Sequence, residues 1–156
     1  NSPLYRETYQ DFLQSDFPII PYPESKDYFL TIVELGKMVR ELHLMKSIDV
    51  KDLITQYPIS DAAKRNIVEM RLFKEEEDGL GKLYINEKQY FDKVPTDVWN
   101  AVIAGYQTLD KWIKDRTNKH LTNEEILHLQ KMIVAIKRTI EIRAEIDQVI
   151  KRQMYE

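Results

Sequence analysis

The last part of the chain carries the pattern of one long helix, and this helix limits what the chain can fold into. Thr122 and Glu125 form a capping box, in which the hydroxyl accepts from the amide three residues on and the carboxylate reaches back. Apolar residues then recur at helical spacing, first Ile126, Leu129, Ile133, Ile136 and Ile140, then Ile142, Ile146, Val149 and Ile150. A helix through Arg152 is ~45 Å long at ~1.5 Å per residue, longer than one small core requires. We therefore expect another copy, or the rest of a longer protein, to cover the second set.

Two further helices are predicted near the start of the chain. Ser2 and Pro3 suit the cap and the first position of one, and Ser25 begins the next. The second helix has an apolar stripe at a spacing of three and four, formed by Tyr28, Ile32, Leu35, Val39, Leu42 and Met45. Gly36 lies inside this helix, where glycine costs about 1 kcal/mol relative to alanine, and it favours close helix packing.

A connector without helix is predicted between these two helices. Residues 16–24 contain three prolines, each of which fixes its own φ and disfavours helix in the residue before it. Ile19, Ile20 and Tyr22 make this connector too apolar for a free linker. We expect it to lie against the core.

Alternation replaces helical spacing in the middle of the chain. Residues 67–73 alternate, which predicts a strand with Val68, Met70 and Leu72 on one face. Residues 83–85 are its expected partner, and the Asp78-Gly79 pair between them is a hairpin turn signal. The acidic run 75–78 consists of residue types that can bind a metal. Adjacent acids at a hairpin tip are far more typical of a solvated loop, so we assign no metal site.

The remaining segments complete the fold class. Residues 86–94 show no regular pattern, helices are expected over 96–103 and 106–115, and residues 116–121 form a polar turn. We predict a single domain over residues 1–156, in the α+β class and mostly helical. It has several helices, a small central β-hairpin or sheet, and a long C-terminal helix.

Composition excludes most catalytic chemistry. The chain has no cysteine, which removes disulfides, thiolate nucleophiles and zinc sites built on sulfur. Its three histidines lie far apart, and its four glycines form no phosphate-binding loop. No apolar run approaches the ~20 residues of a membrane span. The net charge of -3 argues mildly against a free-standing nucleic-acid binder, but not against a module that works beside a basic neighbour.

Basic residues crowd into one segment beside aromatic rings. Five potential cations, counting one histidine, lie within ten residues next to a tyrosine and a tryptophan: Lys111, Lys114, Arg116, Lys119 and His120. Such cations can neutralise phosphates from an exposed helix end, and the amide of Gln107 suits a bidentate contact to an adenine edge. The alternative is a solvated helix face, since charge runs are usually only surface. We assign Trp99, Tyr106 and Trp112 to the core.

This segment belongs to a longer series of landmarks. They run from Tyr5-Arg6-Glu7, Asp16-Phe17-Pro18 and Ile20-Pro21-Tyr22-Pro23 through Glu34-Leu35-Gly36, Tyr57-Pro58-Ile59 and Gln89-Tyr90-Phe91 to Val98-Trp99-Asn100, Gly105-Tyr106-Gln107 and Lys111-Trp112-Ile113-Lys114-Asp115-Arg116. In this order they resemble the C-terminal target-recognition (specificity) domain of type ISP restriction-modification enzymes. The chain departs from the family at residues 117–120, where a glycine and a basic residue are common, and at Ala104, where the family often has tyrosine.

The resemblance implies a bacterial, cytoplasmic parent enzyme of which this chain is a C-terminal piece. The parent would combine a nuclease, a helicase-like ATPase using Mg-ATP, and a methyltransferase that modifies adenine with S-adenosylmethionine. This piece would hold no cofactor and no catalytic residue. It would bind double-stranded DNA beside the methyltransferase domain of the same polypeptide and help to read the target, so that the right adenine is flipped.

Site residues follow from the basic segment and the resemblance together. We expect Lys111, Lys114, Arg116 and Lys119 to contact phosphates, and Gln107 and the 62–88 region to contact base edges or stack. A rival hypothesis is a non-catalytic scaffold whose last helix docks another domain or a second copy. A third, a stand-alone enzyme, would require a deep pocket with converging acids or histidines.

Overall fold

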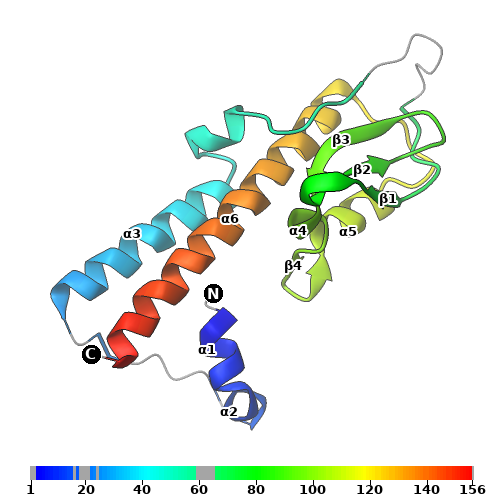
Figure 1. Cartoon of the computed structure of the whole chain (residues 1–156). Coiled ribbons are helices and arrows are strands. Elements are labelled where there is room, and N and C mark those ends of the chain that lie inside the picture. The colour runs from blue at the N-terminus through cyan, green and yellow to red at the C-terminus, as the bar shows by residue number, and fades with distance from the viewer. Residues whose placement is uncertain (1–2, 16, 18–21, 24, 59–65, 156) are drawn as a thin grey trace.

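The fold is built from helices around two small antiparallel sheets (Figure 1). This computed structural model describes residues 3–15, 17, 22–23, 25–58 and 66–155. The helices are α1 (Pro3–Thr8), α2 (Gln10–Ser15), α3 (Lys26–His43), α4 (Thr96–Trp99), α5 (Thr108–Lys114) and α6 (Asn123–Tyr155), with the 3₁₀ turns η1 (Ile48–Lys51) and η2 (Glu77–Gly79). The strands are β1 (Leu72–Glu75), β2 (Leu80–Tyr84), β3 (Tyr90–Pro95), β4 (Val102–Ile103) and β5 (Tyr106–Gln107). The predicted fold class is confirmed, with its central sheet and long last helix.

Helix α6 begins at the predicted capping box. The backbone amide of Glu125 donates to the Thr122 hydroxyl at 3.1 Å, and the Thr122 amide donates to the Glu125 carboxylate at 3.0 Å. Two amides that the first turn would leave without partners are thereby satisfied. None of the helices in the described part of the chain is both long and apolar enough to cross a membrane.

The first hydrophobic core lies between the three-stranded sheet and the N-terminal half of α6. The sheet has the order β1-β2-β3, with every neighbouring pair antiparallel. Its inner face carries Leu83 and Phe91, which are fully buried against Val98 of α4, Ile113 of α5 and Ile133 of α6. Burial of each such side chain stabilises the fold by about 1.5–3 kcal/mol.

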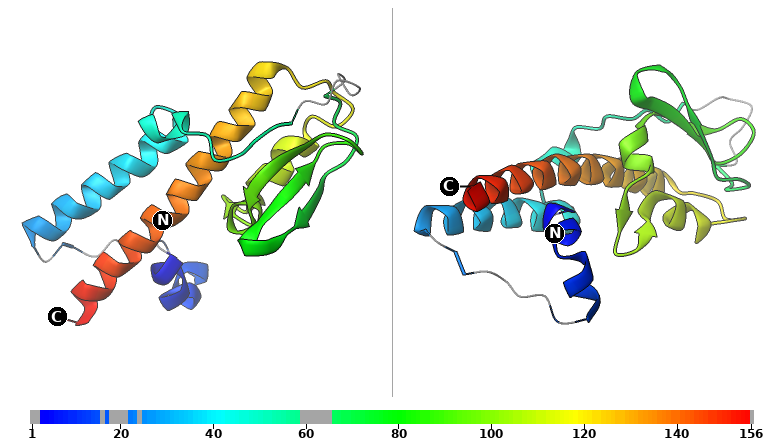
Figure 2. Two further views of the ribbon diagram at one scale, coloured as in Figure 1. Left: turned by 45° about the horizontal axis from the view of Figure 1, so that its top comes forward. Right: turned by 60° about the horizontal axis from the view of Figure 1, so that its bottom comes forward.

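A second core covers the C-terminal half of α6. Ile142 and Ile146 of α6 pack against Leu35, Val39 and Leu42 of α3, and η1 closes the end of this core. Figure 2 shows α3 alongside the later half of α6, while the sheet lies near its first half. The expectation that another copy or the rest of a longer protein covers this face is therefore wrong, because α3 of the same chain covers it.

Strand β3 occupies the segment that was predicted to be irregular. Gly81 pairs with Val94 and Leu83 pairs with Phe91, so between these pairs one residue of β2 faces two residues of β3. This bulge places Lys93 at a φ of 60° and sets the buried Phe91 and Val94 three positions apart. A strand with that spacing shows no alternation in its sequence.

A second irregularity lies before β1, which therefore begins at Leu72 and not at residue 67 as predicted. The amides of Glu69 and Met70 both donate to the carbonyl of Ile85, at 2.7 and 3.0 Å, so two consecutive residues face one partner. The inward face therefore changes from Val68, which is fully buried, to Phe73, which packs on the first core. Leu72 is 43% exposed, so its predicted place on the buried face is wrong.

The helix predicted over residues 96–103 ends after one turn. Val102 and Ile103 instead form β4, which pairs with β5 around a two-residue turn. Ala104 and Gly105 both have positive φ, 52° and 84°, as a type I′ turn requires. Gly105, which lies between the two predicted helices, is the second residue of this hairpin turn.

The N-terminal segment differs in part from its prediction. Two short helices, α1 and α2, replace the single expected helix, and α1 packs against α6. In the connector, Tyr22 is 95% exposed, so its expected place against the core is wrong. Ile19 and Ile20 lie outside the described residues.

Alanine substitution should change the free energy of unfolding in opposite directions at Gly36 and at Gly81. A Cβ on Gly36 meets no atom within 4 Å, so the expected close helix packing is absent and Gly36→Ala should raise the free energy of unfolding by about 0.5–1 kcal/mol. A Cβ on Gly81 would lie 2.5 Å from the Phe73 ring and 2.6 Å from the Lys74 carbonyl, so Gly81→Ala should lower it by about 1–3 kcal/mol. Urea unfolding measures both. Equal effects at the two positions would contradict this packing.

Candidate nucleic-acid interface

The predicted cations gather at the C-terminal end of α5. Lys111 and Lys114 lie on α5, and Arg116 and Lys119 lie in the turn that follows it; these four residues are called the basic cluster below. Residues 110–120 contain these four basic side chains and two carboxylates, those of Asp110 and Asp115. The C-terminal end of a helix carries a partial negative charge, and this charge stabilises basic side chains near it.

Arg116 joins α5 to the start of α6. Its guanidinium lies 3.6 Å from the centre of the Trp112 ring, and it also donates to the Trp112 carbonyl at 3.1 Å. Its Nε donates to the Glu125 carboxylate at 3.0 Å. The pKa of Glu125 is lowered, first by the backbone hydrogen bond from Thr122 and then by Arg116. Arg116 is therefore a structural brace, and its side chain is 26% exposed.

The three lysines of the basic cluster are more exposed. Lys111 pairs with Asp115 at 3.1 Å, and its Nζ lies 5.7 Å from the centre of the Tyr106 ring. Lys119 donates to the Asp115 carbonyl at 3.0 Å, which satisfies an oxygen at the end of α5. Lys114 is exposed, and within the described ranges it makes no ion pair. Surface ion pairs of the kind that Lys111 makes contribute at most about 1 kcal/mol, so a phosphate can replace the partner.

Tyr106 lies on the surface, and the side chain of Gln107 is partly covered. The Gln107 side chain is half-buried and donates to the Trp99 carbonyl at 2.7 Å, so one of its amide hydrogens is already used. Tyr106 was assigned to the core, but it is 60% exposed on the β4–β5 hairpin, so that assignment is wrong. Trp99 and Trp112 are half-buried against the first core, as predicted.

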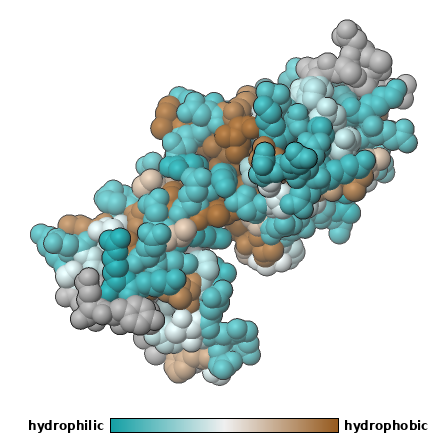
Figure 3. Space-filling view, viewed as in Figure 1, coloured by the Kyte–Doolittle hydropathy of each residue, from teal (hydrophilic) through white to brown (hydrophobic). Residues whose placement is uncertain are grey.

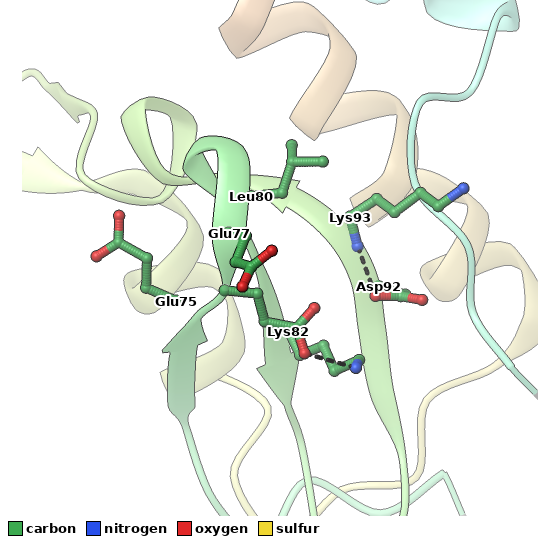
Figure 4. Close-up of a pocket in the computed structure, with 7 residues that line it drawn as sticks. Glu75, Glu77, Leu80, Lys82, Asp92 and Lys93 are labelled. Carbon is green, nitrogen blue, oxygen red and sulfur yellow. Dashed lines mark hydrogen bonds and ion pairs between the residues drawn. The ribbon is translucent and has the colours of Figure 1, made fainter.

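Charge is separated along the sheet. The acidic run of residues 75–78 lies at the β1–β2 turn. At the other end of β1, residues 66–68 are hydrogen-bonded to residues 118–121, next to the basic cluster. Figure 4 shows the hollow beside the acidic turn, where Lys82 pairs with Glu76 at 2.6 Å. Four of the seven residues that line it are acidic, so this hollow repels an anion, whereas the exposed positive charge lies at the basic cluster.

No metal centre is found in the described part of the chain. The acidic run 75–78 does not converge with other ligands, and no group of three His, Cys, Asp or Glu side chains there could hold an ion. Lys82 pairs with Glu76, and Thr96 donates to Glu75 at 3.2 Å. These acids act as partners within the fold.

Comparison with known proteins assigns the chain to a family. A family model described as the Type ISP C-terminal specificity domain matches residues 1–145. The chain belongs to this family. No curated protein matches it. The resemblance inferred from the sequence landmarks is therefore confirmed.

Two solved structures share the fold of this Type ISP specificity domain. One is a nuclease-deletion mutant of the Type ISP restriction-modification enzyme LlaGI in complex with a DNA substrate mimic, with a TM-score of 0.63, 20% identity and coverage of 93% of this chain and 15% of that chain. The other is the ATP-dependent Type ISP enzyme LlaBIII bound to DNA, with a TM-score of 0.61, 18% identity and coverage of 93% and 10%. The present chain thus spans about a seventh and a tenth of these two chains.

Buried amides hold the basic end of the Type ISP specificity domain, and no sequence pattern reveals them. The Asn66 side-chain oxygen accepts from the Tyr57 hydroxyl at 3.0 Å and from Gln89 at 2.7 Å. Gln89 in turn accepts from Asn86 at 2.9 Å, and Asn86 also donates to the Ile67 carbonyl. The network joins three separate parts of the chain, residues 57, 66–67 and 86–89, and only the fold brings these parts together. Satisfied networks of this kind give a surface a defined shape.

The outer face of the sheet carries a second group of aromatic and basic residues. The rings of Tyr84 and Tyr90 lie 5.0 Å apart, with Lys74 5.1 Å from the first and Lys82 5.5 Å from the second. Hydrogen bonding to Glu76 raises the pKa of Lys82. This face belongs to the region predicted to contact bases, of which residues 62–65 lie outside the described part.

We expect Arg116→Ala and Lys114→Ala to differ in stability, because Arg116 makes contacts within the fold and Lys114 is exposed. Loss of the ring contact, the carbonyl contact and the Glu125 pair in Arg116→Ala should lower the free energy of unfolding by about 1–2 kcal/mol. Lys114→Ala should change it by about 0.5 kcal/mol or less, as is usual for an exposed residue. Urea titration of both variants is the measurement. A stability loss at Lys114 as large as that at Arg116 would contradict the assignment.

Tyr57 should make stability fall in alkali. Burial raises the pKa of Tyr57 from 10.0 to about 12. Because the folded pKa is the higher one, the contribution to the free energy of unfolding is complete below pH 10 and is lost between pH 10 and about 12. Tyr57→Phe removes the hydrogen bond to Asn66, so its free energy of unfolding near neutral pH should be about 1 kcal/mol lower. Above pH 10 the stability of this variant should decline less than that of the unchanged chain. Parallel declines in the two proteins would reject this role.

Proposed function

We propose that this chain binds duplex DNA and contributes to target recognition in a Type ISP restriction-modification enzyme. The observation that carries the proposal is the basic cluster, which is exposed at a braced helix end in a chain of the specificity-domain family. Two proteins of the same fold are described as bound to DNA or to a DNA substrate mimic, which supports it.

Phosphate contacts are the proposed role of the basic cluster. Lys111, Lys114 and Lys119 extend from the end of α5 with ammonium groups that can exchange a weak internal partner for a phosphate oxygen. Arg116 would contribute mainly through its charge, since two of its hydrogen bonds are made within the fold. These contacts fix orientation on the duplex and carry no sequence information by themselves.

Base contacts are proposed for Gln107 and for the 62–88 region. Gln107 retains its side-chain oxygen and one amide hydrogen after the bond to Trp99, which suffices for a contact to an adenine edge. In the 62–88 region, Tyr84 with Lys74 over its ring is the described pair best suited to stacking. Such contacts supply the specificity that phosphate contacts lack.

The proposed partner within the same polypeptide is an adenine methyltransferase domain. That domain would bind S-adenosylmethionine, and a further ATPase portion would bind Mg-ATP, outside the present chain. By holding the duplex beside that domain, the chain would present the adenine for flipping. We propose a cytoplasmic location for the enzyme.

The scaffold hypothesis loses the observation that motivated it. It rested on the second apolar stripe of α6, and Ile142 and Ile146 in that stripe are buried by α3 of the same chain. Within the described part of the chain, the basic cluster makes one ion pair with another element, between Arg116 and Glu125 of α6, and its three lysines make none. DNA binding is therefore the better supported function.

Reversal of charge at Lys114 and Lys119 tests the proposal. In the Lys114→Glu/Lys119→Glu variant, duplex affinity should fall, and the slope of log affinity against log salt should decrease by about 2, because two phosphate contacts are removed. Fluorescence anisotropy with a labelled duplex measures both, for this chain and for the longer enzyme.

Lys37→Glu is the matched control, because Lys37 is an exposed lysine on α3 with a side chain that is 59% exposed. It changes the net charge of the chain in the same direction but lies outside the basic cluster. Its effect on the salt slope should be close to zero. If the double variant behaves like this control, the basic cluster does not contact DNA.

A further inference from the structure

The β4–β5 hairpin presents two exposed apolar side chains beside the basic cluster. Tyr106 is 60% exposed and Val102 is 58% exposed, on strands of only two residues each. Figure 1 shows the hairpin projecting from the sheet-bearing half of the molecule, and Figure 3, in the same view, shows a hydrophobic spot where it projects. A short projection of this kind has no core of its own, so its exposed ring needs a separate explanation.

The hairpin is held rigidly at its base. The Thr108 amide donates to the Ala101 carbonyl, and the Gln107 side chain donates to the Trp99 carbonyl at 2.7 Å. Trp99 is in turn stacked on Phe73 of β1, with ring centres 5.3 Å apart. The two-residue turn fixes the tip. The position of Tyr106 is therefore set before any partner binds, which lowers the entropy lost on binding.

The surroundings of the ring identify the kind of partner. Lys111 lies over Tyr106 at 5.7 Å, and Lys114 follows on the same helix. Asp110, the nearest acid in the sequence, is paired with Arg71 through two hydrogen bonds of 2.9 and 3.0 Å. An exposed ring with a lysine ammonium over it suits a planar group that is attached to an anion. A nucleobase next to its phosphate has this composition.

We propose that Tyr106 contacts a nucleobase of the bound duplex by its ring face, with Val102 as the apolar side of the same contact. This inference rests on the proposed DNA-binding function and adds the element that enters the stacked bases. Side chains that enter a base step in this way unstack it, and their ring or methyl surface replaces the lost contact. The lysines of the basic cluster hold the phosphates on either side.

Tyr106→Ala and Tyr106→Phe test the contact by duplex binding, measured by fluorescence anisotropy across a salt series. Tyr106→Ala should weaken binding by about 5-fold or more, the range expected for loss of one stacked base. Its salt slope should stay unchanged, because a neutral ring is removed. Tyr106→Phe keeps the ring and should bind within about 2-fold of the unchanged chain. Tyr22→Ala, which removes a ring that is 95% exposed near the start of α3, is the control.

A second measurement does not depend on the stability of the variants. Duplexes containing 5-iodouracil are irradiated with the unchanged protein, and the cross-linked peptide is identified by mass spectrometry. Cross-links should map to Tyr106. A cross-link map without residues 102–107 overturns the proposal.

The outcomes separate the two proposals. If Tyr106→Ala binds as the unchanged chain does while Lys114→Glu/Lys119→Glu loses affinity and slope, the ring contact is rejected and DNA binding stands. If both variants bind unchanged, both proposals fall. Equal losses in Tyr106→Ala and Tyr106→Phe would assign the contact to the hydroxyl and overturn the ring-face contact.

Discussion

Burial of both halves of α6 is the constraint on which the rest of the structure depends. Its first half completes the core beneath the three-stranded sheet, and its second half completes the core with α3. In the part of the chain that the structure describes, neither the sheet nor α3 packs against another element of comparable length. Because one helix belongs to both cores, it fixes the position of the sheet relative to α3.

The candidate interface is anchored to the beginning of this helix. Thr122 and Glu125 close the first turn of α6, and the same Glu125 carboxylate receives the guanidinium of Arg116. Stacking of Arg116 on Trp112 then ties the end of α5 to the first core. The exposed lysines are thus presented by a helix end and a turn that are fixed from two sides, while the contacts of Lys111 and Lys119 stay within α5 and this turn.

The parts of the fold that were predictable from the sequence are those in which local pattern and tertiary packing agree. The capping box, the stripes of α3 and α6 and the Asp78-Gly79 turn are all local signals, and each is confirmed. The bulge at Lys93 and the turn at Ala104 were missed, because each depends on the register of a paired strand. Tyr106 was misplaced for the same reason, since a helix would have turned it inward.

The site illustrates why net charge is a weak guide to an anion-binding surface. The chain has a net charge of -3, yet four of its 26 acids stand together at the β1–β2 turn, and Asp110, beside the basic cluster in the sequence, is paired with Arg71. What an anion meets is the local field at the end of α5, where lysines outnumber unpaired carboxylates. Under the proposed function the same arrangement would orient the partner, because a polyanion that approaches the acidic turn is repelled. The position of the charges, and not their sum, would then determine which end of the sheet faces the duplex.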